Sequence, residues 1–173
     1  VHEKGFDVLL RAFAKIDRLK VPARLIIAGD GPLRAEYARL IEELDLGDRV
    51  IVWRRAERTE VPNLMANAEL LVVPSREEPF GIVVLEGLAS GVPVVAARTE
   101  GIPEILQDGV TGLMYEAESD TELARLIEGL YRDPELKASL VREGLKLVKD
   151  HYTWDAATGR FLSQFEALLW RPS

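Results

Sequence analysis

Two carboxylates are the residues of this sequence whose type and spacing point most directly to chemistry. Glu78 and Glu86 are separated by seven residues within PSREEPFGIVVLEGLASGVPVVA, residues 74–96. This stretch reads as a strand, a helix and a second strand, and its other residues are mostly apolar and small. An ionised carboxylate in such surroundings costs free energy unless donors hydrogen-bond to it. Sugar hydroxyls are suitable donors, so the pair predicts a ligand site; the structural alternative makes Glu78 a helix-start residue and Glu86 a surface residue.

The expected helix 81–90 begins at a residue that leaves its N-terminus open. Gly81 has no side chain, so the N–H groups of Gly81, Ile82 and Val83 can face a ligand. The helix dipole favours a nearby negative charge by about 0.3–1 kcal/mol at an exposed site. Glu78 precedes this terminus, and Glu86 lies about one and a half turns inside the helix. We expect both carboxylates to point into one crevice at different depths.

A second glycine-containing loop, AGDGP at residues 28–32, follows the apolar run LII and leads into a helix. Gly29 and Gly31 allow tight turning and close approach of a ligand to the backbone. The loop lacks the third glycine of the dinucleotide fingerprint, so we expect no nicotinamide cofactor. An ordinary turn is the structural alternative.

Short apolar runs alternate with amphipathic helical patterns along the whole chain. Runs without polar alternation indicate strands buried on both faces, and their alternation with helices predicts an α/β fold with a doubly wound parallel sheet. Ligands bind such sheets at the carboxyl ends of the strands, where both loops fall. The expected strands are 24–29, 49–53, 70–74, 92–97 and 112–115, and the expected helices are 6–16, 32–46, 59–68, 81–90, 103–107, 120–131, 134–150 and 153–170.

Composition excludes several classes of function. A length of 173 residues suits one domain, and no apolar run is long enough to cross a bilayer. The absence of cysteine removes disulfide and thiolate chemistry and is compatible with a cytoplasmic location. The net charge of −7 argues against nucleic-acid binding. No Asp-x-Asp element is present, and His2 and His151 lie at opposite ends of the chain, so we expect no metal site.

These motifs together resemble the C-terminal, donor-binding domain of retaining GT-B glycosyltransferases, the large family that includes sucrose synthase and bacterial mannosyltransferases. The resemblance extends over nearly the whole chain. It rests on the motifs EKGFDVLLRAFAKI, LIIAGDGP, PSREEPFGIVVLEGLASGVPVVA, GIPEILQDGVTGLMY and YTW. It implies a Rossmann-like domain over residues 1–173, closed by helix 153–170. It also implies transfer of a hexosyl group from a nucleoside diphosphate sugar with retention of anomeric configuration.

Residue roles follow from the resemblance. Glu78 and the loop that carries Phe80 and Gly81 would contact the donor sugar, and Lys4 would hold the departing phosphates. The other donor contacts would be Glu86 to the ribose, the N–H groups of Ile82 and Val83 to the diphosphate, Gly29 and Gly31 along the crevice, and the end of strand 49–53 with Arg54 beside the base. A fixed lysine and a helix N-terminus would stabilise the charge of the leaving group without a metal or a cofactor.

The sequence departs from the family pattern at several places, and each departure leads to an expectation about the structure or the activity. The usual arginine before the lysine, with its central strand, and the N-terminal acceptor domain do not occur in this chain. We therefore expect a gap in the sheet, weak donor binding and no turnover by the chain alone, and an acceptor (sugar, lipid or small molecule) bound by that other domain. Arg54 and Glu100 stand where glycine is usual. Aromatic and apolar residues of the last helix are expected to be partly exposed, namely Phe161, Phe165, Leu168 and Trp170.

Other functions compete with this interpretation. A GT-B nucleotide-sugar epimerase shares the architecture, and so does a phosphorylase, which would need a pyridoxal-binding lysine that the sequence does not identify. A non-catalytic nucleotide-binding or regulatory module of flavodoxin type would need a phosphorylatable aspartate or a flavin loop. Asp30 is the only acid so placed beside glycine, and it lacks the paired acids of a receiver site. We expect no membrane contact from this domain.

Overall fold

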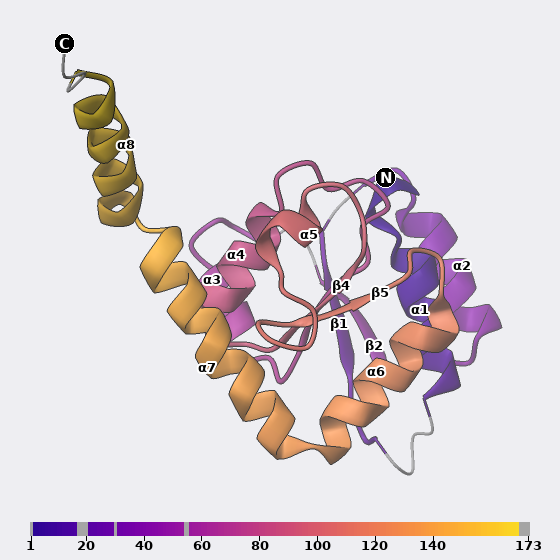
Figure 1. The fold of residues 1–173 in the computed structure, drawn as a ribbon. Coiled ribbons are helices and arrows are strands. Elements are labelled where there is room, and N and C mark those ends of the chain that lie inside the picture. The colour runs from indigo at the N-terminus through magenta and orange to yellow at the C-terminus, as the bar shows by residue number, and fades with distance from the viewer. Residues whose placement is uncertain (1, 17–20, 30, 54–55, 170–173) are drawn as a thin grey trace.

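The structure is a computed structural model that describes residues 2–16, 21–29, 31–53 and 56–169. Helices and strands alternate from α1 to β5, and three helices follow (Figure 1). The strands are β1 (Leu25–Ala28), β2 (Val50–Trp53), β3 (Leu71–Val73), β4 (Val94–Ala97) and β5 (Leu113–Tyr115). The helices are η1 (His2–Lys4), α1 (Phe6–Lys15), α2 (Arg34–Glu43), α3 (Val61–Ala66), α4 (Ile82–Ala89), α5 (Ile102–Ile105), α6 (Asp120–Arg132), α7 (Pro134–His151) and α8 (Trp154–Leu169).

Every strand and helix expected from the sequence is present, with ends that differ by a few residues. The largest difference is at α2, which was expected over 32–46 and spans Arg34–Glu43. The short 3-10 helix η1, which carries Lys4, was not predicted. A segment of three residues has no hydrophobic periodicity to detect.

All the paired strands are parallel, and they form two sheets. β3, β4 and β5 pair in that order, and β1 pairs with β2. No pairing joins β1 to β3 in the described part of the chain, so the expected gap in the sheet is present. The parallel α/β class predicted from the sequence is confirmed.

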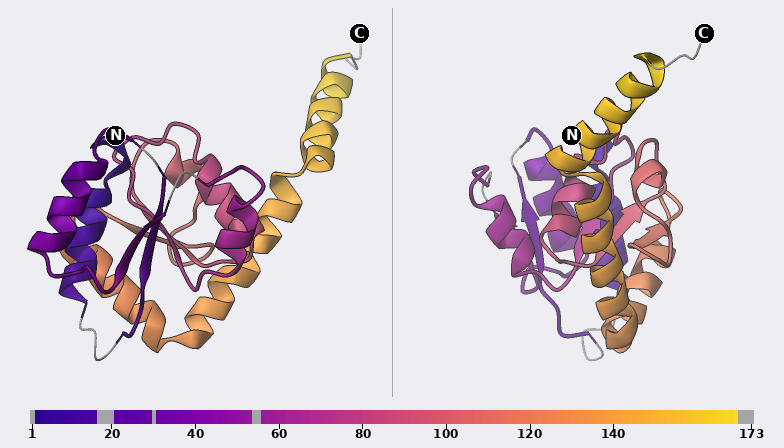
Figure 2. Two further views of the ribbon diagram at one scale, coloured as in Figure 1. Left: turned by 180° about the vertical axis from the view of Figure 1, so that it is seen from behind. Right: turned by 60° about the vertical axis from the view of Figure 1, so that its left-hand side comes forward.

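The three-stranded sheet is covered by helices on both faces, which is the doubly wound arrangement (Figures 1 and 2). Every residue of β4 is buried. Its residues alternate between two apolar clusters, because successive side chains of a strand point to opposite faces. Val95 and Ala97 belong to the cluster that contains α1 and α6, and Val94 and Ala96 belong to the cluster that contains α4 and α5.

The expectation that all strands are buried on both faces is wrong for β1 and β2. Ile27 is buried, but its neighbour Ile26 is 49% exposed and Ile51 on the paired strand is 40% exposed. The two strands form their own sheet, and the apolar cluster built on α1 and α2 covers the face that carries Ile27. Residue type alone did not reveal this, since isoleucine suits either position.

The last helices leave the body of the domain. α7 packs against α4, and α8 extends beyond it, away from the sheets (Figures 1 and 2). Phe161 is 61% and Phe165 is 49% exposed, which confirms the exposure expected for them. The side chains of Leu168 and Trp170 lie outside the described part. Among the described helices, none combines the length and apolar character needed to cross a membrane.

Candidate functional site

The candidate site lies where η1 meets the loop that follows β3, residues 74–81. Gly5, directly after η1, fixes this contact. It has φ 62°, and a Cβ atom there would lie 1.9 Å from the carbonyl oxygen of Pro74. No other residue fits at this position without moving the backbone. The EKG motif therefore brings Lys4 against the loop, and the backbone N–H of Arg76 donates to the carbonyl oxygen of Glu3 at 2.7 Å.

Lys4 and Glu78 form an ion pair in this corner, with 3.0 Å between Nζ and Oε2. The Glu78 side chain is only 12% exposed, whereas that of Lys4 is 48% exposed. Both residues were predicted to belong to the site, but their direct contact was not predicted. The Lys4 end of the pair is open to solvent, so water and an anionic ligand can compete with Glu78 for its ammonium group.

Helix α4 begins beside this pair, and its first turn has no side-chain cap. Gly81, the N-cap, has φ 58°, and a Cβ atom there would lie 2.7 Å from Cδ1 of Ile105. The first N–H groups of a helix have no partner within the helix, and a glycine cap offers them no acceptor. Phe80 and Ile82 flank this end and are 75% and 58% exposed. Val83 is half-buried in the same turn.

Glu86 lies on the outer side of α4. It is exposed and follows Ile82 by one helical turn on the same face. The expectation that its carboxylate sits in a buried apolar environment is wrong, because the buried residues of α4 are Val84, Gly87 and Leu88, whereas Glu86 is exposed. No contact joins Glu86 to Glu78, which is turned toward Lys4. Their meeting in one crevice stays a prediction.

Gly29 and Gly31 follow the carboxyl end of β1, which pairs in parallel with β2. Both are half-buried, and a Cβ atom on Gly29 would meet nothing within 4 Å. Close packing therefore does not explain the glycine at position 29. Arg54 and Asp30 lie outside the described residues.

Arg76, in the site loop, makes a set of contacts that sequence analysis missed. Its guanidinium donates two hydrogen bonds to Asp7, at 2.8 and 2.9 Å, two to Glu118, and one to the carbonyl oxygen of His2 at 2.7 Å. These hydrogen bonds lower the pKa of Asp7 and raise the pKa of Arg76. The only sequence signal was an arginine inside a motif of glutamates, and the partners are distant in sequence.

The loop that follows β4 packs against the site loop. The hydroxyl of Thr99 donates to the carbonyl oxygen of Ser75 at 3.1 Å. A Cβ atom at Gly101 would lie 2.3 Å from the carbonyl oxygen of Pro79, so the two loops touch through their backbones. Glu100, between these contacts, has φ 37°, a conformation that suits glycine. This backbone geometry explains why glycine is the residue expected at position 100, where this chain has glutamate.

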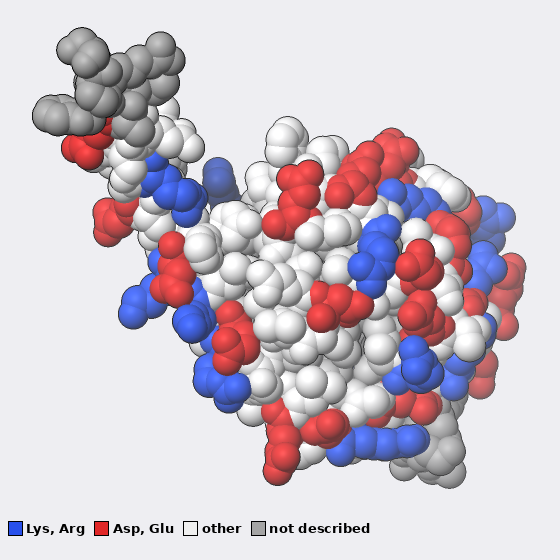
Figure 3. Space-filling view, viewed as in Figure 1, with Lys and Arg blue, Asp and Glu red and all other residues white. Residues whose placement is uncertain are grey.

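The face in Figure 3 shows acidic and basic side chains interspersed, without a broad basic surface over the described residues there. Among the described residues, no group of three or more histidine, aspartate or glutamate side chains could hold a metal ion.

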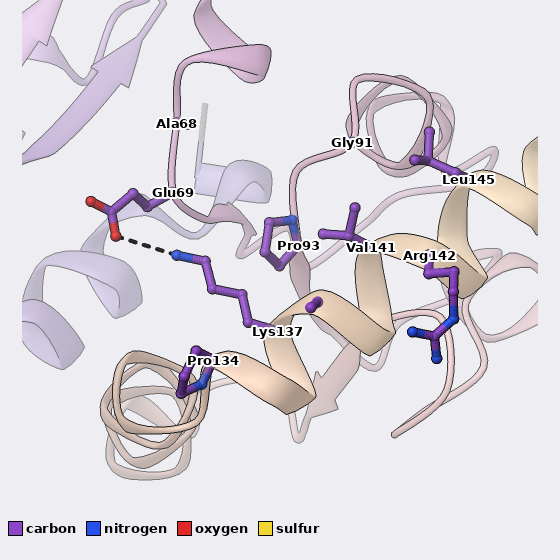
Figure 4. A pocket seen from close by; sticks show the side chains of 10 residues that line it. Ala68, Glu69, Gly91, Pro93, Pro134, Lys137, Val141, Arg142 and Leu145 are labelled. Atoms are coloured by element: carbon purple, nitrogen blue, oxygen red, sulfur yellow. Dashed lines mark hydrogen bonds and ion pairs between the residues drawn. The ribbon is translucent and has the colours of Figure 1, made fainter.

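A separate shallow groove of about 610 Å³ lies at the opposite edge of the fold (Figure 4). Glu69 precedes β3 and Pro93 precedes β4, so the groove is at the amino ends of these strands. Lys137 of α7 pairs with Glu69 across it at 3.3 Å. None of its lining residues belongs to the candidate site.

Comparisons with known proteins find a matching family model and several similar proteins. The family model described as glycosyl transferases group 1 matches residues 1–147. The chain is 34% identical to an alpha-D-kanosaminyltransferase of Streptomyces kanamyceticus over 90% of its own length and 40% of that protein. It is 32% identical to an N-acetyl-alpha-D-glucosaminyl L-malate synthase of Bacillus anthracis over 95% of its length and 42% of that protein. The chain thus spans about two fifths of the length of these curated relatives.

Solved structures of glycosyl transferases and related proteins match the fold of this chain. The Anabaena protein HepE, crystallised in complex with UDP, matches with a TM-score of 0.86 and 25% identity over 96% of this chain and 46% of its own. The C-terminal domain of a group 1 glycosyl transferase from Francisella tularensis matches with a TM-score of 0.80 over 89% of this chain and 82% of its own. The identity there is 24%, so this second match concerns the fold.

Proposed function

The chain belongs to the family of group 1 glycosyl transferases, and on this premise we propose that it is the donor-binding half of a retaining hexosyltransferase that uses a nucleoside diphosphate sugar. The observation that carries the proposal is the Lys4–Glu78 ion pair beside the uncapped start of α4. A cation, an anion and a row of backbone donors then lie in one corner of the fold. Such a corner suits a ligand that is negative at one end and rich in hydroxyls at the other.

The diphosphate would bind between Lys4 and the first turn of α4. Lys4 supplies a mobile positive charge, because its side chain is half exposed. The N–H groups of Ile82 and Val83 supply fixed donors, and the helix dipole adds a favourable field. Both act on charge that grows as the leaving group departs, so they stabilise the transition state more than the bound donor.

The sugar would bind at Glu78. Its carboxylate is largely enclosed, and it can accept hydrogen bonds from two hydroxyls once Lys4 turns to the phosphates. The exposed ring of Phe80 would lie beside the sugar. Glu86 would accept from the ribose further along α4. Gly29 and Gly31 would line the crevice, and Arg54 would flank the base.

The reaction breaks the bond between the anomeric carbon and the phosphate oxygen, and the electron pair leaves with the diphosphate. The oxygen of the acceptor hydroxyl forms its bond to the anomeric carbon on the same face, and its proton passes to the departing phosphate. The chain supplies charge stabilisation and orientation for this step. The acceptor would bind to the part of the enzyme that corresponds to the remaining length of the relatives.

Calorimetric titration of the complete protein with UDP, GDP and ADP, and with their glucose, mannose and N-acetylglucosamine conjugates, tests the proposal. We expect one nucleoside diphosphate and its sugar conjugates to bind more tightly than the other two series. Failure of every member of the panel to bind would overturn the proposal.

A further inference from the structure

Arg76 contacts none of the residues that we propose to bind the donor, yet all the N–H groups of its guanidinium are hydrogen-bonded. A guanidinium has five N–H donors, and each of them makes a hydrogen bond here. Asp7 and Glu118 each accept two, in the planar two-by-two geometry that arginine provides and lysine does not. The fifth goes to the carbonyl oxygen of His2. With no N–H left over, Arg76 is not itself available as a phosphate ligand.

The acceptors come from three parts of the chain that the guanidinium of Arg76 links by hydrogen bonds. His2 is in η1, Asp7 is in the first turn of α1, and Glu118 follows β5. Glu118 has φ 68°, a left-handed conformation that glutamate rarely adopts. The local structure therefore holds this residue in an unfavourable backbone conformation at the place where it meets the guanidinium.

The contacts of Arg76 lie immediately beside the candidate site. Its backbone N–H bonds the carbonyl oxygen of Glu3, the residue before Lys4, at 2.7 Å. Arg76 itself is two residues before Glu78. Arg76 thus links the segment that carries Lys4 to the loop that carries Glu78.

We propose that Arg76 is a positioning residue for the donor, which sets the spacing between Lys4 and Glu78 and hence between the phosphate contact and the sugar contact. This inference rests on the proposed function. Its side chain is 17% exposed and that of Asp7 is 21% exposed, so water competes poorly for these hydrogen bonds. Lysine at position 76 would keep the charge but lose the paired geometry, and η1 would then move relative to the site loop.

The test compares two ligands on the complete protein carrying Arg76→Lys. One is the nucleoside diphosphate sugar that the unaltered protein binds, and the other is the matching nucleoside monophosphate, which lacks the sugar and the terminal phosphate. We expect the affinity for the sugar nucleotide to fall about tenfold, and kcat by up to about 100-fold, because small misplacements of binding groups have effects of this size. The affinity for the monophosphate should stay within about twofold.

A purely structural role for Arg76 would lower both affinities in parallel, and that result would overturn the proposal, as would unchanged binding of both ligands. Arg98→Lys is the matched control, because Arg98 also bonds two carboxylates, those of Glu116 at 3.2 Å and Asp108 at 2.8 Å, without touching η1. It should leave the ratio of the two affinities unchanged.

Asp7→Asn removes one charged partner and keeps a hydrogen-bond acceptor, so it provides a milder variant should Arg76→Lys not fold. It should show the same selective loss for the sugar nucleotide, and a parallel loss of both ligands would count against the proposal. If the unaltered protein binds neither ligand, the proposed function itself is overturned. If it binds both ligands and the variants do not change the ratio of the two affinities, only the proposed role of Arg76 is overturned.

Discussion

Lys4 Nζ lies 3.0 Å from Glu78 Oε2, although 74 positions separate the two residues in the sequence. Gly5 makes this contact possible, because only a residue without a side chain can pass the carbonyl of Pro74 at such close range. The pair places opposite charges at the open end of α4. A bound sugar nucleotide would replace the Lys4–Glu78 contact by two new ones, from Lys4 to its phosphates and from its sugar hydroxyls to Glu78.

Removing the cation should weaken binding of the diphosphate selectively. Lys4→Met retains much of the apolar stem and loses the charge, so we expect the affinity for the nucleoside diphosphate sugar to fall roughly tenfold and kcat to fall about 100-fold or more. Calorimetry and initial rates on the complete protein measure both. The matched control is Lys137→Met, which breaks the Lys137–Glu69 pair at the opposite edge and should change neither quantity. Equal effects of the two substitutions would contradict the role of Lys4.

Glu86 can be tested through the ribose hydroxyls. If its carboxylate accepts hydrogen bonds from them, Glu86→Ala should weaken nucleotide binding roughly tenfold, as expected for a hydrogen bond to a charged group. A 2′-deoxynucleotide should bind the unaltered protein more weakly than the ribonucleotide does, and Glu86→Ala should remove most of this difference. Titration of both proteins with both nucleotides gives the answer. Unchanged affinity in Glu86→Ala would assign Glu86 to the exposed surface of α4 alone.

Gly81 should tolerate no side chain. Gly81→Ala combines a left-handed backbone with a Cβ atom 2.7 Å from Ile105 Cδ1, and we expect it to lower the free energy of unfolding by about 1–3 kcal/mol. Ile105→Val removes the clashing atom, so the double variant should recover part of the loss. Gly47→Ala is the control, since a Cβ atom there meets nothing within 4 Å. Denaturant unfolding compares these four variants with the unaltered protein, and a loss in Gly81→Ala no larger than that of the control would be contrary to the geometry.

Glu100 offers a test in the stabilising direction. Its φ of 37° costs an ordinary residue more than it costs glycine, so Glu100→Gly should raise the free energy of unfolding by about 0.5–1 kcal/mol. Glu100→Ala removes the carboxylate but keeps Cβ, and it should bring no gain. Thermal or denaturant unfolding compares the two variants. Stabilisation by alanine and not by glycine would show that charge, rather than backbone strain, governs this position.

Acid stability should depend on Asp7. Hydrogen bonds from Arg76 hold the pKa of Asp7 below its usual value of 3.8 in the folded chain. The ionised carboxylate therefore contributes stability that is fully present above 3.8 and is lost as the pH falls through the lower folded pKa. Asp7→Asn should flatten this part of the stability curve in thermal unfolding between about pH 2 and pH 5. The pKa of Asp120, hydrogen-bonded by Lys15, is also lowered, so Asp120→Asn should remove a further part. A slope in Asp7→Asn equal to that of the unaltered protein would contradict this prediction.

The sequence predicted the fold class and the elements because local signals were strong. Uninterrupted apolar runs such as the one at β4 indicate buried strands, and Gly81 marked the start of α4. The sequence could not show that Ile26 and Ile51 are exposed, because burial of these residues depends on how the sheets are placed.

The site was predicted only in part. The residue types at Lys4, Glu78 and Gly81 pointed to chemistry, but the pairing of Lys4 with Glu78 depends on contacts between distant segments. The partners of Arg76 were missed for the same reason, since Asp7 and Glu118 are far from it in sequence. Glu86 was placed in the right helix, yet its exposed position removed the desolvation argument that first drew attention to it.

The central claim is that the phosphates of a sugar nucleotide bind between Lys4 and the first turn of α4. A crystal structure of the complete protein with its nucleoside diphosphate tests this most directly. The account predicts the terminal phosphate within about 3 Å of Lys4 Nζ and of the N–H groups of Ile82 or Val83, with Glu78 released from Lys4. A nucleotide bound in the groove beside Glu69 and Lys137, or one that leaves the Lys4–Glu78 pair intact and α4 uncovered, would contradict it.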